Sequence, residues 1–504
     1  MKKRLAIFLS VITVSSALLS TVTGCGIKDT TEYLTLDSYI QSVNEKNLEE
    51  IKADATFDEA DYLLDYENAD LSDREVSLSD GDNGHSTKDA AKQDIEALFK
   101  LLKYRYAGYT YFGGDEKFEN AKEEILNKID SSTKDKINRN ELCEMILPAL
   151  SFVYDSHFLI EGMQTFKEAH TYHESSKMEF YKDSKGYYTK LEEKQWYLPA
   201  DFEKYLKVTI GKSGELVYGM YAVVIDKTTL PNEVELYNNS KKNTVNLTWI
   251  VSEVGGAQSS ISEYTEENGV AISSLSNMSP SPSTMQSHNE FLNNSKKHAE
   301  AENSILDLRQ NSGGVPDFDF FWAYGYTGEI VDFNWKQLLY FDEAYVDYNI
   351  NELFQSFLEL DIVKSNPELK DFYLKAANEK NVKNQLIITD GTYDVDMDNL
   401  AKNENKLFVL QSKRCYSSGE YFIEILHNIE NVLTVGTNTN GCIHTGIVSM
   451  ASLPNSKLKL SFSQGINIGP DKELDIYGIE PDIYIASEDA QEAVLRCIDY
   501  YKQK

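Results

Sequence analysis

The chain has 504 residues, of which 41% are hydrophobic and 12% aromatic, so its composition supports a packed interior and excludes an intrinsically disordered protein. One hydrophobic core rarely accommodates this length, and two or three domains are therefore expected. The formal net charge of −32 repels polyanions, which argues against a nucleic-acid partner.

The N-terminus has the order of an export signal. A basic MKKR is followed by the apolar run LAIFLSVITVSSALLSTV and by VTGC, which ends at Cys25, so residues 1–24 are predicted to be a signal peptide. The VTGC segment resembles a bacterial lipoprotein lipobox, which implies cleavage before Cys25 and a diacylglycerol on its thiol. The alternative is an ordinary signal peptide with a chance cysteine. We expect the mature protein to be held on the extracytoplasmic face of the cell membrane by this lipid.

Residues 25–86 are acidic and rich in Asp, Glu and Ser, and are predicted to form a tether with at most one short helix. Residues 87–165 are predicted to be helical, because DIEALFKLLKYRYAGY and ELCEMILPALSFVY repeat their apolar positions with a helical period. This helical domain ends in the tripeptide Asp155-Ser156-His157.

The remaining chain changes character twice. Residues 166–272 contain aromatic and β-branched runs separated by turn residues, which predict a β-rich module. Residues 273–300 are polar and rich in turn formers, and a linker is predicted there. Residues 301–504 alternate short buried strands such as SILDL and LFVLQ with amphipathic helices, which predicts an α/β catalytic core.

Four cysteines follow Cys25 in the sequence, and they are too few for a disulfide scaffold and lack the spacing of a zinc site. Cys415 with Cys442 is the only pairing that stands out. His170 and His173 could share a face, but no acidic pattern completes a metal site, so no metal or other cofactor is expected.

The stretch RCYSSGEYF supports two interpretations. Ser417 and Glu420, placed before an apolar helical run, fit a capping box. A serine at a strand–turn–helix junction also fits a nucleophile, because the N–H groups at a helix start can stabilise an oxyanion. The motif by itself favours the cap, since such boxes are common.

Two further segments suggest catalysis. SILDLRQNSGG predicts a buried strand that ends in Gly313 and Gly314, and paired glycines either form an ordinary tight turn or present N–H groups to a ligand. His157 could be the base that a serine nucleophile requires, although most histidines are surface or core residues.

Taken together, SILDLRQNSGG, CYSSGE, VGTNTNG and YGIEPD, with DSH upstream, resemble the S41 family of serine peptidases, which includes the C-terminal processing and tricorn-type proteases. The resemblance covers about residues 87–165 and 300–500. It implies a catalytic core like that of ClpP and crotonase, and peptide or protein substrates. Many members carry a PDZ domain between the helical and catalytic parts. The β-rich module could be a divergent PDZ domain or another module.

The family uses two catalytic arrangements. Processing proteases pair the serine with a lysine 25 positions later, and here that position is Cys442, so the dyad is absent. The tricorn-type branch uses a Ser-His pair, the serine nucleophile and a carboxylate just before G-[IV]-x-P-D. The matching residues in this sequence are Ser156, His157, Ser417 and Asp475, with Glu473 as the alternative carboxylate.

The resemblance implies a serine endopeptidase in which Ser417 attacks the scissile carbonyl, His157 takes its proton, and Asp475 orients the imidazole directly or through Ser156. The backbone N–H groups of Ser418 and of Gly313 or Gly314 would form the oxyanion hole. The alternative function is a catalytically inactive, peptide-binding lipoprotein of the same fold, for which the missing lysine is the best argument.

Overall fold

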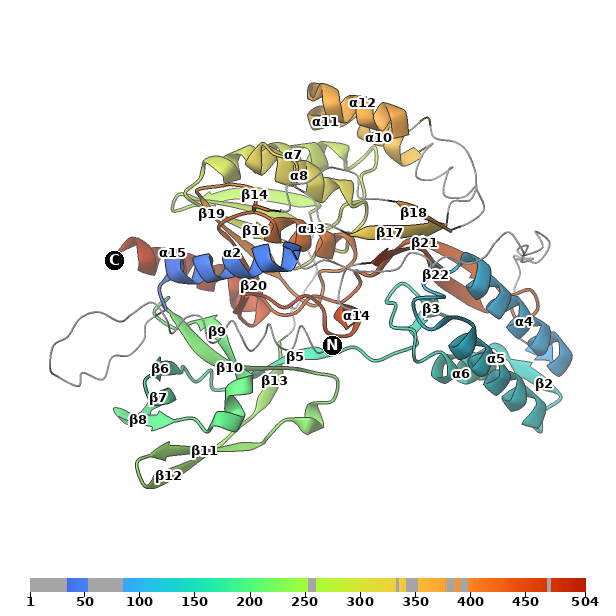
Figure 1. Cartoon of the computed structure of the whole chain (residues 1–504), viewed down its shortest axis with the longest axis horizontal. Helices are drawn as coiled ribbons and strands as arrows, with labels where there is room; N and C mark the ends of the chain where they lie inside the picture. Colours follow the sequence, from blue (N-terminus) through green and yellow to red (C-terminus); the bar gives the residue numbers. More distant parts are fainter. Residues whose placement is uncertain are drawn as a thin grey trace.

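The computed structural model describes residues 34–52, 85–252, 260–331, 335–340, 352–376, 378, 386–389, 398–468 and 473–504. The predicted signal peptide, Cys25 and most of the predicted tether lie outside these residues. The described chain forms a central α/β unit, a helical unit and a β module (Figure 1).

A six-stranded sheet lies at the centre of the α/β unit, in the order β14-β15-β16-β19-β20-β23. All neighbouring strands are parallel except the edge pair β14–β15. The strands are β14 (Ser262–Glu267), β15 (Val270–Leu275), β16 (Asn303–Asp307), β19 (Lys406–Gln411), β20 (Val432–Gly436) and β23 (Ile483–Tyr484).

Helices cover both faces of this sheet, as expected for a parallel sheet whose strands are buried on both sides. In β19, Leu407 and Val409 face one core while Phe408 and Leu410 face the other, which is the two-residue alternation of a strand. The first face carries α7 (Met285–Glu300), α8 (Asp317–Thr327), α10 (Phe354–Phe357), α11 (Asp361–Ser365), α12 (Pro367–Ala376) and α13 (Ser418–His427), and the second carries α2 (Leu36–Lys52) and α15 (Ala490–Lys502).

The helical unit is joined to the α/β unit through a second sheet. In this sheet β22 (Lys459–Ile468) pairs with β3 (Leu159–Ile160), which begins two residues after His157. The other members are β4 (Met163–Gln164), β17 (Lys336–Tyr340), β18 (Leu386–Thr389) and β21 (Thr445–Ser452). Helices α4 (Lys88–Arg105), α5 (Gly114–Ser131) and α6 (Arg139–Ala149) pack on β22, and the hairpin β1 (His85–Thr87) and β2 (Lys136–Asn138) completes the unit. Residues around His157 are therefore anchored to the catalytic unit by strand pairing.

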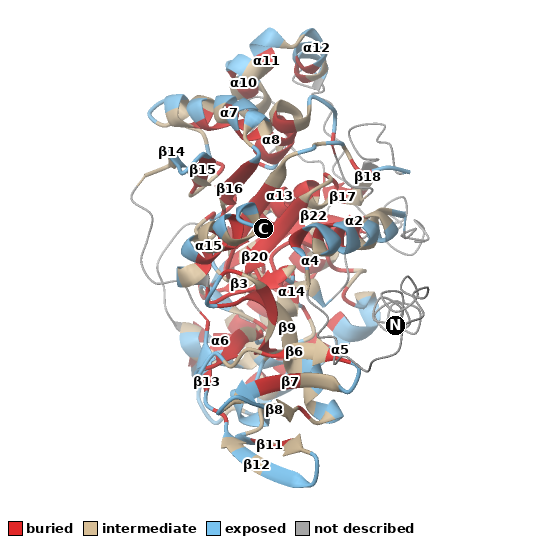
Figure 2. Cartoon of the chain, turned by 90° about the vertical axis from the view of Figure 1, so that its left-hand side faces the viewer, coloured by how far each residue is buried: buried red, intermediate tan, exposed pale blue. Residues whose placement is uncertain are grey.

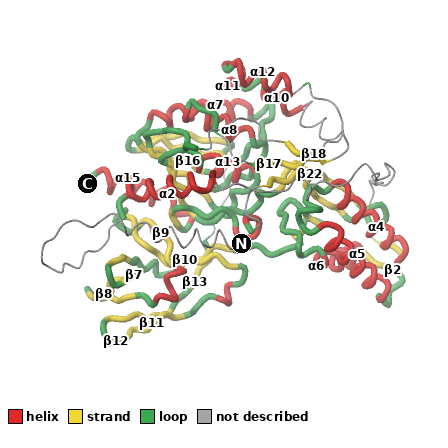
Figure 3. Tube along the Cα trace, in the orientation of Figure 1, coloured by secondary structure: helices red, strands yellow, loops and turns green. Residues whose placement is uncertain are grey.

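The β module contains two antiparallel sheets, β13-β5-β10-β9 and β12-β11-β8-β7-β6. The strands are β5 (His170–Glu174), β6 (Tyr181–Asp183), β7 (Gly186–Leu191), β8 (Lys194–Tyr197), β9 (Leu206–Ile210), β10 (Leu216–Val224), β11 (Glu233–Asn238), β12 (Lys241–Asn246) and β13 (Trp249–Val251). Figure 3 shows this module as strands and loops with short helical turns, the 3-10 helices η2 (Ala200–Tyr205) and η3 (Lys227–Thr229). From β5 to β13 the described residues contain no α-helix.

Two predicted boundaries differ from the structure. The linker predicted over 273–300 is wrong, since β15 and α7 occupy most of it and both belong to the α/β unit, which therefore begins before residue 301. The tether predicted over 25–86 contains the 17-residue helix α2, whose Leu36, Ile40 and Val43 are buried against the central sheet. Figure 2 shows the buried residues concentrated along the central strands.

No helix among the described residues is both long enough and apolar enough to cross a membrane.

Candidate active site

Ser417 stands at the junction of β19 and α13, in a backbone conformation that is rare for a residue with a side chain. Its φ is 56° and its ψ is −129°, and α13 begins at the next residue. Strain of this kind persists only where the surroundings hold it, and it is typical of a serine presented on a sharp strand-to-helix turn. The local sequence explains the turn, since Phe422, Ile425 and Leu426 bury the helix face that follows.

Glu420 holds this turn from the first turn of α13. Its carboxylate accepts the Ser417 N–H at 3.2 Å, so the carboxylate half of the predicted capping box is present. The same group accepts the N–H groups of Gly441 at 2.8 Å and Cys442 at 2.7 Å, and the Thr439 hydroxyl at 2.5 Å. Burial raises the pKa of Glu420 to about 7, against the lowering effect of these hydrogen bonds. One buried carboxylate thus holds the serine turn and the 439–442 loop together.

Two backbone N–H groups beside Ser417 are candidates for an oxyanion hole. Ser418 is the first residue of α13, so its N–H has no acceptor within the helix. Its hydroxyl donates to the Gly314 carbonyl at 2.7 Å, which ties the helix start to the Gly-Gly turn. The Gly313 N–H instead donates to the Asn311 side chain at 2.8 Å. Ser418 and Gly314 are therefore the better pair of donors.

Gly313 lies in direct contact with the serine. Its φ is 74°, and a methyl group added to it would lie 2.8 Å from the Ser417 Cβ and 3.0 Å from the Ser418 nitrogen. Only a residue without a side chain fits this position, because the turn needs both a positive φ and a close backbone approach.

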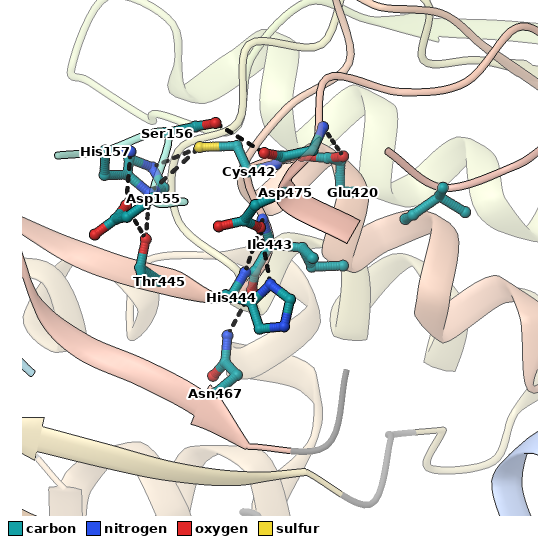
Figure 4. A network of polar contacts seen from close by, with 12 residues as sticks. Asp155, Ser156, His157, Glu420, Cys442, Ile443, His444, Thr445, Asn467 and Asp475 are labelled. Atoms are coloured by element: carbon teal, nitrogen blue, oxygen red, sulfur yellow. Dashed lines mark hydrogen bonds and ion pairs between the residues drawn. The ribbon is translucent and has the colours of Figure 1, made fainter. Parts of the chain in front are cut away.

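The Asp-Ser-His tripeptide lies opposite the 441–445 loop (Figure 4). The His157 Nδ1 is 3.1 Å from the Thr445 hydroxyl, and its two ring nitrogens are 3.3 and 3.4 Å from the Cys442 Sγ. The Ser156 hydroxyl donates to the Gly441 carbonyl at 2.8 Å, so it anchors the loop rather than the imidazole. The described residues include no direct hydrogen bond between Ser417 and His157.

Cys442, which occupies the position of the lysine of the dyad peptidases, is a buried free thiol. Burial raises its pKa well above the ordinary value, and the nearby carboxylates of Glu420, Asp475 and Asp155 raise it further. A neutral thiol cannot accept the proton of the serine hydroxyl as a lysine base does. Cys415 is also free and buried, so the two cysteines singled out as a pair are not bonded.

Asp475 differs from the expected placement. It lies on the short helix α14 (Leu474–Tyr477), and its carboxylate accepts the Ile443 and His444 N–H groups at 3.2 Å and contacts the His444 Nδ1 at 2.9 Å. The side-chain partner of this carboxylate is therefore His444, a histidine that the sequence patterns did not single out. Glu473, the alternative carboxylate, is the residue immediately before α14.

The sequence patterns also missed the partners of His157 and the role of Glu420 outside its own helix. Asp155, two residues before His157, is fully buried, and Thr445 lies three residues after Cys442. Asp155 belongs to the Asp-Ser-His tripeptide, which was the available signal. Nothing in the sequence marks Thr445, because its contact with His157 joins residues that are 288 positions apart.

A strained serine at a strand–helix junction, with the Ser418 and Gly314 N–H groups beside it and a histidine across the loop, is the arrangement of a serine hydrolase. The sequence model of peptidase family S41 matches residues 348–485. This match covers about a quarter of the chain, which is a serine-type peptidase with an α/β fold.

Comparison with curated proteins finds none that matches the chain. Among solved structures, the chain is similar to mature CPAF complexed with lactacystin, with 14% identity, a TM-score of 0.40, and coverage of 83% of this chain and 99% of that one. It is also similar to a putative peptidase from Parabacteroides merdae, with 14% identity, a TM-score of 0.37, and coverage of 83% and 96%. A lipoprotein from Streptococcus agalactiae gives 11% identity, a TM-score of 0.36, and coverage of 85% and 99%. No residue role is transferred from these likenesses.

Proposed function

We propose that the protein is an exported, lipid-anchored serine endopeptidase in which Ser417 is the nucleophile and His157 the general base. The observation that carries the proposal is the strained Ser417 at the start of α13, beside the Ser418 and Gly314 N–H groups. A serine that served only as a cap would not need a φ of 56°.

In the proposed reaction the Ser417 Oγ attacks the scissile carbonyl of a peptide and its proton passes to His157. The N–H groups of Ser418 and Gly314 stabilise the oxyanion that forms, a contribution of about 3–4 kcal/mol per donor. His157 then protonates the leaving amine, and water hydrolyses the acyl-enzyme by the same steps. Hydrogen bonds between a nucleophile and its base are often longer in a free enzyme and tighten with substrate. The proposal requires Ser417 and His157 to form such a bond when substrate binds.

An active-site fluorophosphonate probe tests the assignment. We expect labelling of the wild type and loss of labelling in Ser417→Ala and His157→Ala. Ser312→Ala is the matched control, because this exposed serine lies in the neighbouring turn and its hydroxyl makes one long hydrogen bond of 3.3 Å. Equal labelling of all four proteins would refute the assignment. Folded protein without labelling or peptide hydrolysis would favour the peptide-binding lipoprotein instead.

The membrane attachment is proposed from the sequence, through a lipid on Cys25. A peptidase of this kind would act on peptides or proteins at the extracytoplasmic face. Fractionation of cells that express the full chain tests this location, with detergent-soluble membrane protein expected for the wild type.

A further inference from the structure

A buried carboxylate reaches His157 through one hydroxyl group. Asp155 is fully buried and receives three hydrogen bonds: from the Tyr106 hydroxyl at 2.8 Å, from the His157 backbone N–H at 2.8 Å, and from the Thr445 hydroxyl at 2.6 Å. The Thr445 oxygen is also 3.1 Å from the His157 Nδ1. Figure 4 shows Asp155, Thr445 and His157 in contact, with Asp475 turned to His444.

The available donors decide which ring nitrogen of His157 carries the proton. An ionised carboxylate only accepts hydrogen bonds, so the single hydroxyl proton of Thr445 goes to Asp155. The Thr445 oxygen can then only accept from the imidazole, which places the ring proton on Nδ1. Nε2, which lies 3.4 Å from the Cys442 Sγ, then carries a lone pair and no proton, and this is the tautomer that a serine nucleophile requires of its base.

We propose that Asp155 and Thr445 are positioning residues that fix the Nδ1–H tautomer and the ring orientation of His157, the task expected of Asp475 from the sequence. This inference rests on the proposed function, because it concerns the base of the same site. Asp475 instead fixes His444 and the backbone of the 443–444 segment.

The surroundings of Asp155 bear on its ionisation. Burial raises the pKa of Asp155 above its ordinary value and the Asp475 charge adds to the rise, while the neighbouring His157 and the hydrogen bonds from Thr445 and Tyr106 oppose it. The titratable groups that face this cluster are Tyr106, which follows α4, Cys442 and His444 from the loop before β21, Glu420 from α13, Glu168 and Asp475. The three hydrogen bonds that the carboxylate accepts stabilise its charged form against this rise, and the relay requires that form.

Nitrogen-15 NMR of the folded full chain at neutral pH reads the tautomer directly. The chain has eight histidines, and the His157→Ala spectrum identifies the signal to be followed. We expect a protonated Nδ1 and an unprotonated Nε2 for His157 in the wild type. A wild-type His157 protonated on Nε2 overturns the proposal whatever the variants do.

Thr445→Val removes the hydroxyl at constant shape, and Thr445→Ser restores it. We expect Thr445→Val to lower kcat by about 10- to 100-fold with KM nearly unchanged, and to lose the pure Nδ1–H signal. We expect Thr445→Ser to recover most of both, and Asp475→Asn to leave the His157 tautomer unchanged. A Thr445→Val enzyme with wild-type kcat and tautomer, or a Thr445→Ser enzyme as impaired as Thr445→Val, refutes the relay.

Failure of the proposed function has a different signature. Hydrolysis that survives Ser417→Ala would remove Ser417 as the nucleophile, while the NMR signal of His157 would still decide the relay.

Discussion

The close approach of Gly313 to Ser417 gives a quantitative prediction for Gly313→Ala. The new methyl carbon would lie 2.8 Å from the Ser417 Cβ and 2.8 Å from the Tyr416 carbonyl oxygen, where carbon atoms normally approach to about 3.5–4.0 Å. The serine must therefore shift by nearly 1 Å. A displacement of that size at a reacting group can lower the rate by about 100-fold. We expect a loss of kcat of that order.

The positive φ at this position adds a cost to stability, and a matched control separates the two effects. Gly313 has a φ of 74° and Gly328, which ends α8, has a φ of 78°, so alanine should cost about 1–2 kcal/mol of unfolding free energy at either position. A methyl group on Gly328 would meet no atom within 4 Å.

Peptide hydrolysis and urea unfolding of both variants provide the assay. Gly328→Ala should be destabilised and fully active, whereas Gly313→Ala should be destabilised and nearly inactive. A folded Gly313→Ala with wild-type kcat would refute the reasoning, because it would show that the turn yields without moving Ser417. Equal loss of activity in both variants would assign the effect to stability alone.

Three further predictions concern the rest of the chain. Burial raises the pKa of Glu424 to about 8, above its ordinary 4.5, so its contribution to stability is present below pH 4.5 and is lost as pH rises through 8. Glu424→Gln should therefore flatten the fall in unfolding free energy between pH 5 and 8. An unchanged pH dependence of the unfolding free energy, measured by urea titration, would contradict this. Ile40→Ala should lower the unfolding free energy by about 2–4 kcal/mol, because Ile40 is buried. Gln41→Ala, at the exposed neighbouring position, should change it by less than about 0.5 kcal/mol. An Ile40→Ala protein with the wild-type unfolding free energy would mean that α2 does not contribute to the core. Cys25→Ser should release the protein from the membrane fraction, and unchanged retention would rule out the lipid anchor.

Local patterns in the sequence predicted the elements of the catalytic unit well. The runs SILDL and LFVLQ correspond to β16 and β19, and the helix after Ser417 follows the period of its apolar residues. These predictions succeed because strand alternation and helix periodicity are properties of short segments. The linker over 273–300 failed because polar residues on the outer face of α7 hid a helix whose Phe291 and Leu292 are buried.

The sequence by itself determined the peptidase resemblance, the absence of the lysine at Cys442 and the candidate pair Ser417 and His157. Only the tertiary structure decided the partners of each group. The Asp475 carboxylate contacts the His444 ring. The Thr445 hydroxyl connects Asp155 with His157, although 290 positions separate Asp155 from Thr445. Hydrogen-bond partners depend on how β3 and β21 come together on β22, and that pairing leaves no mark in the local sequence.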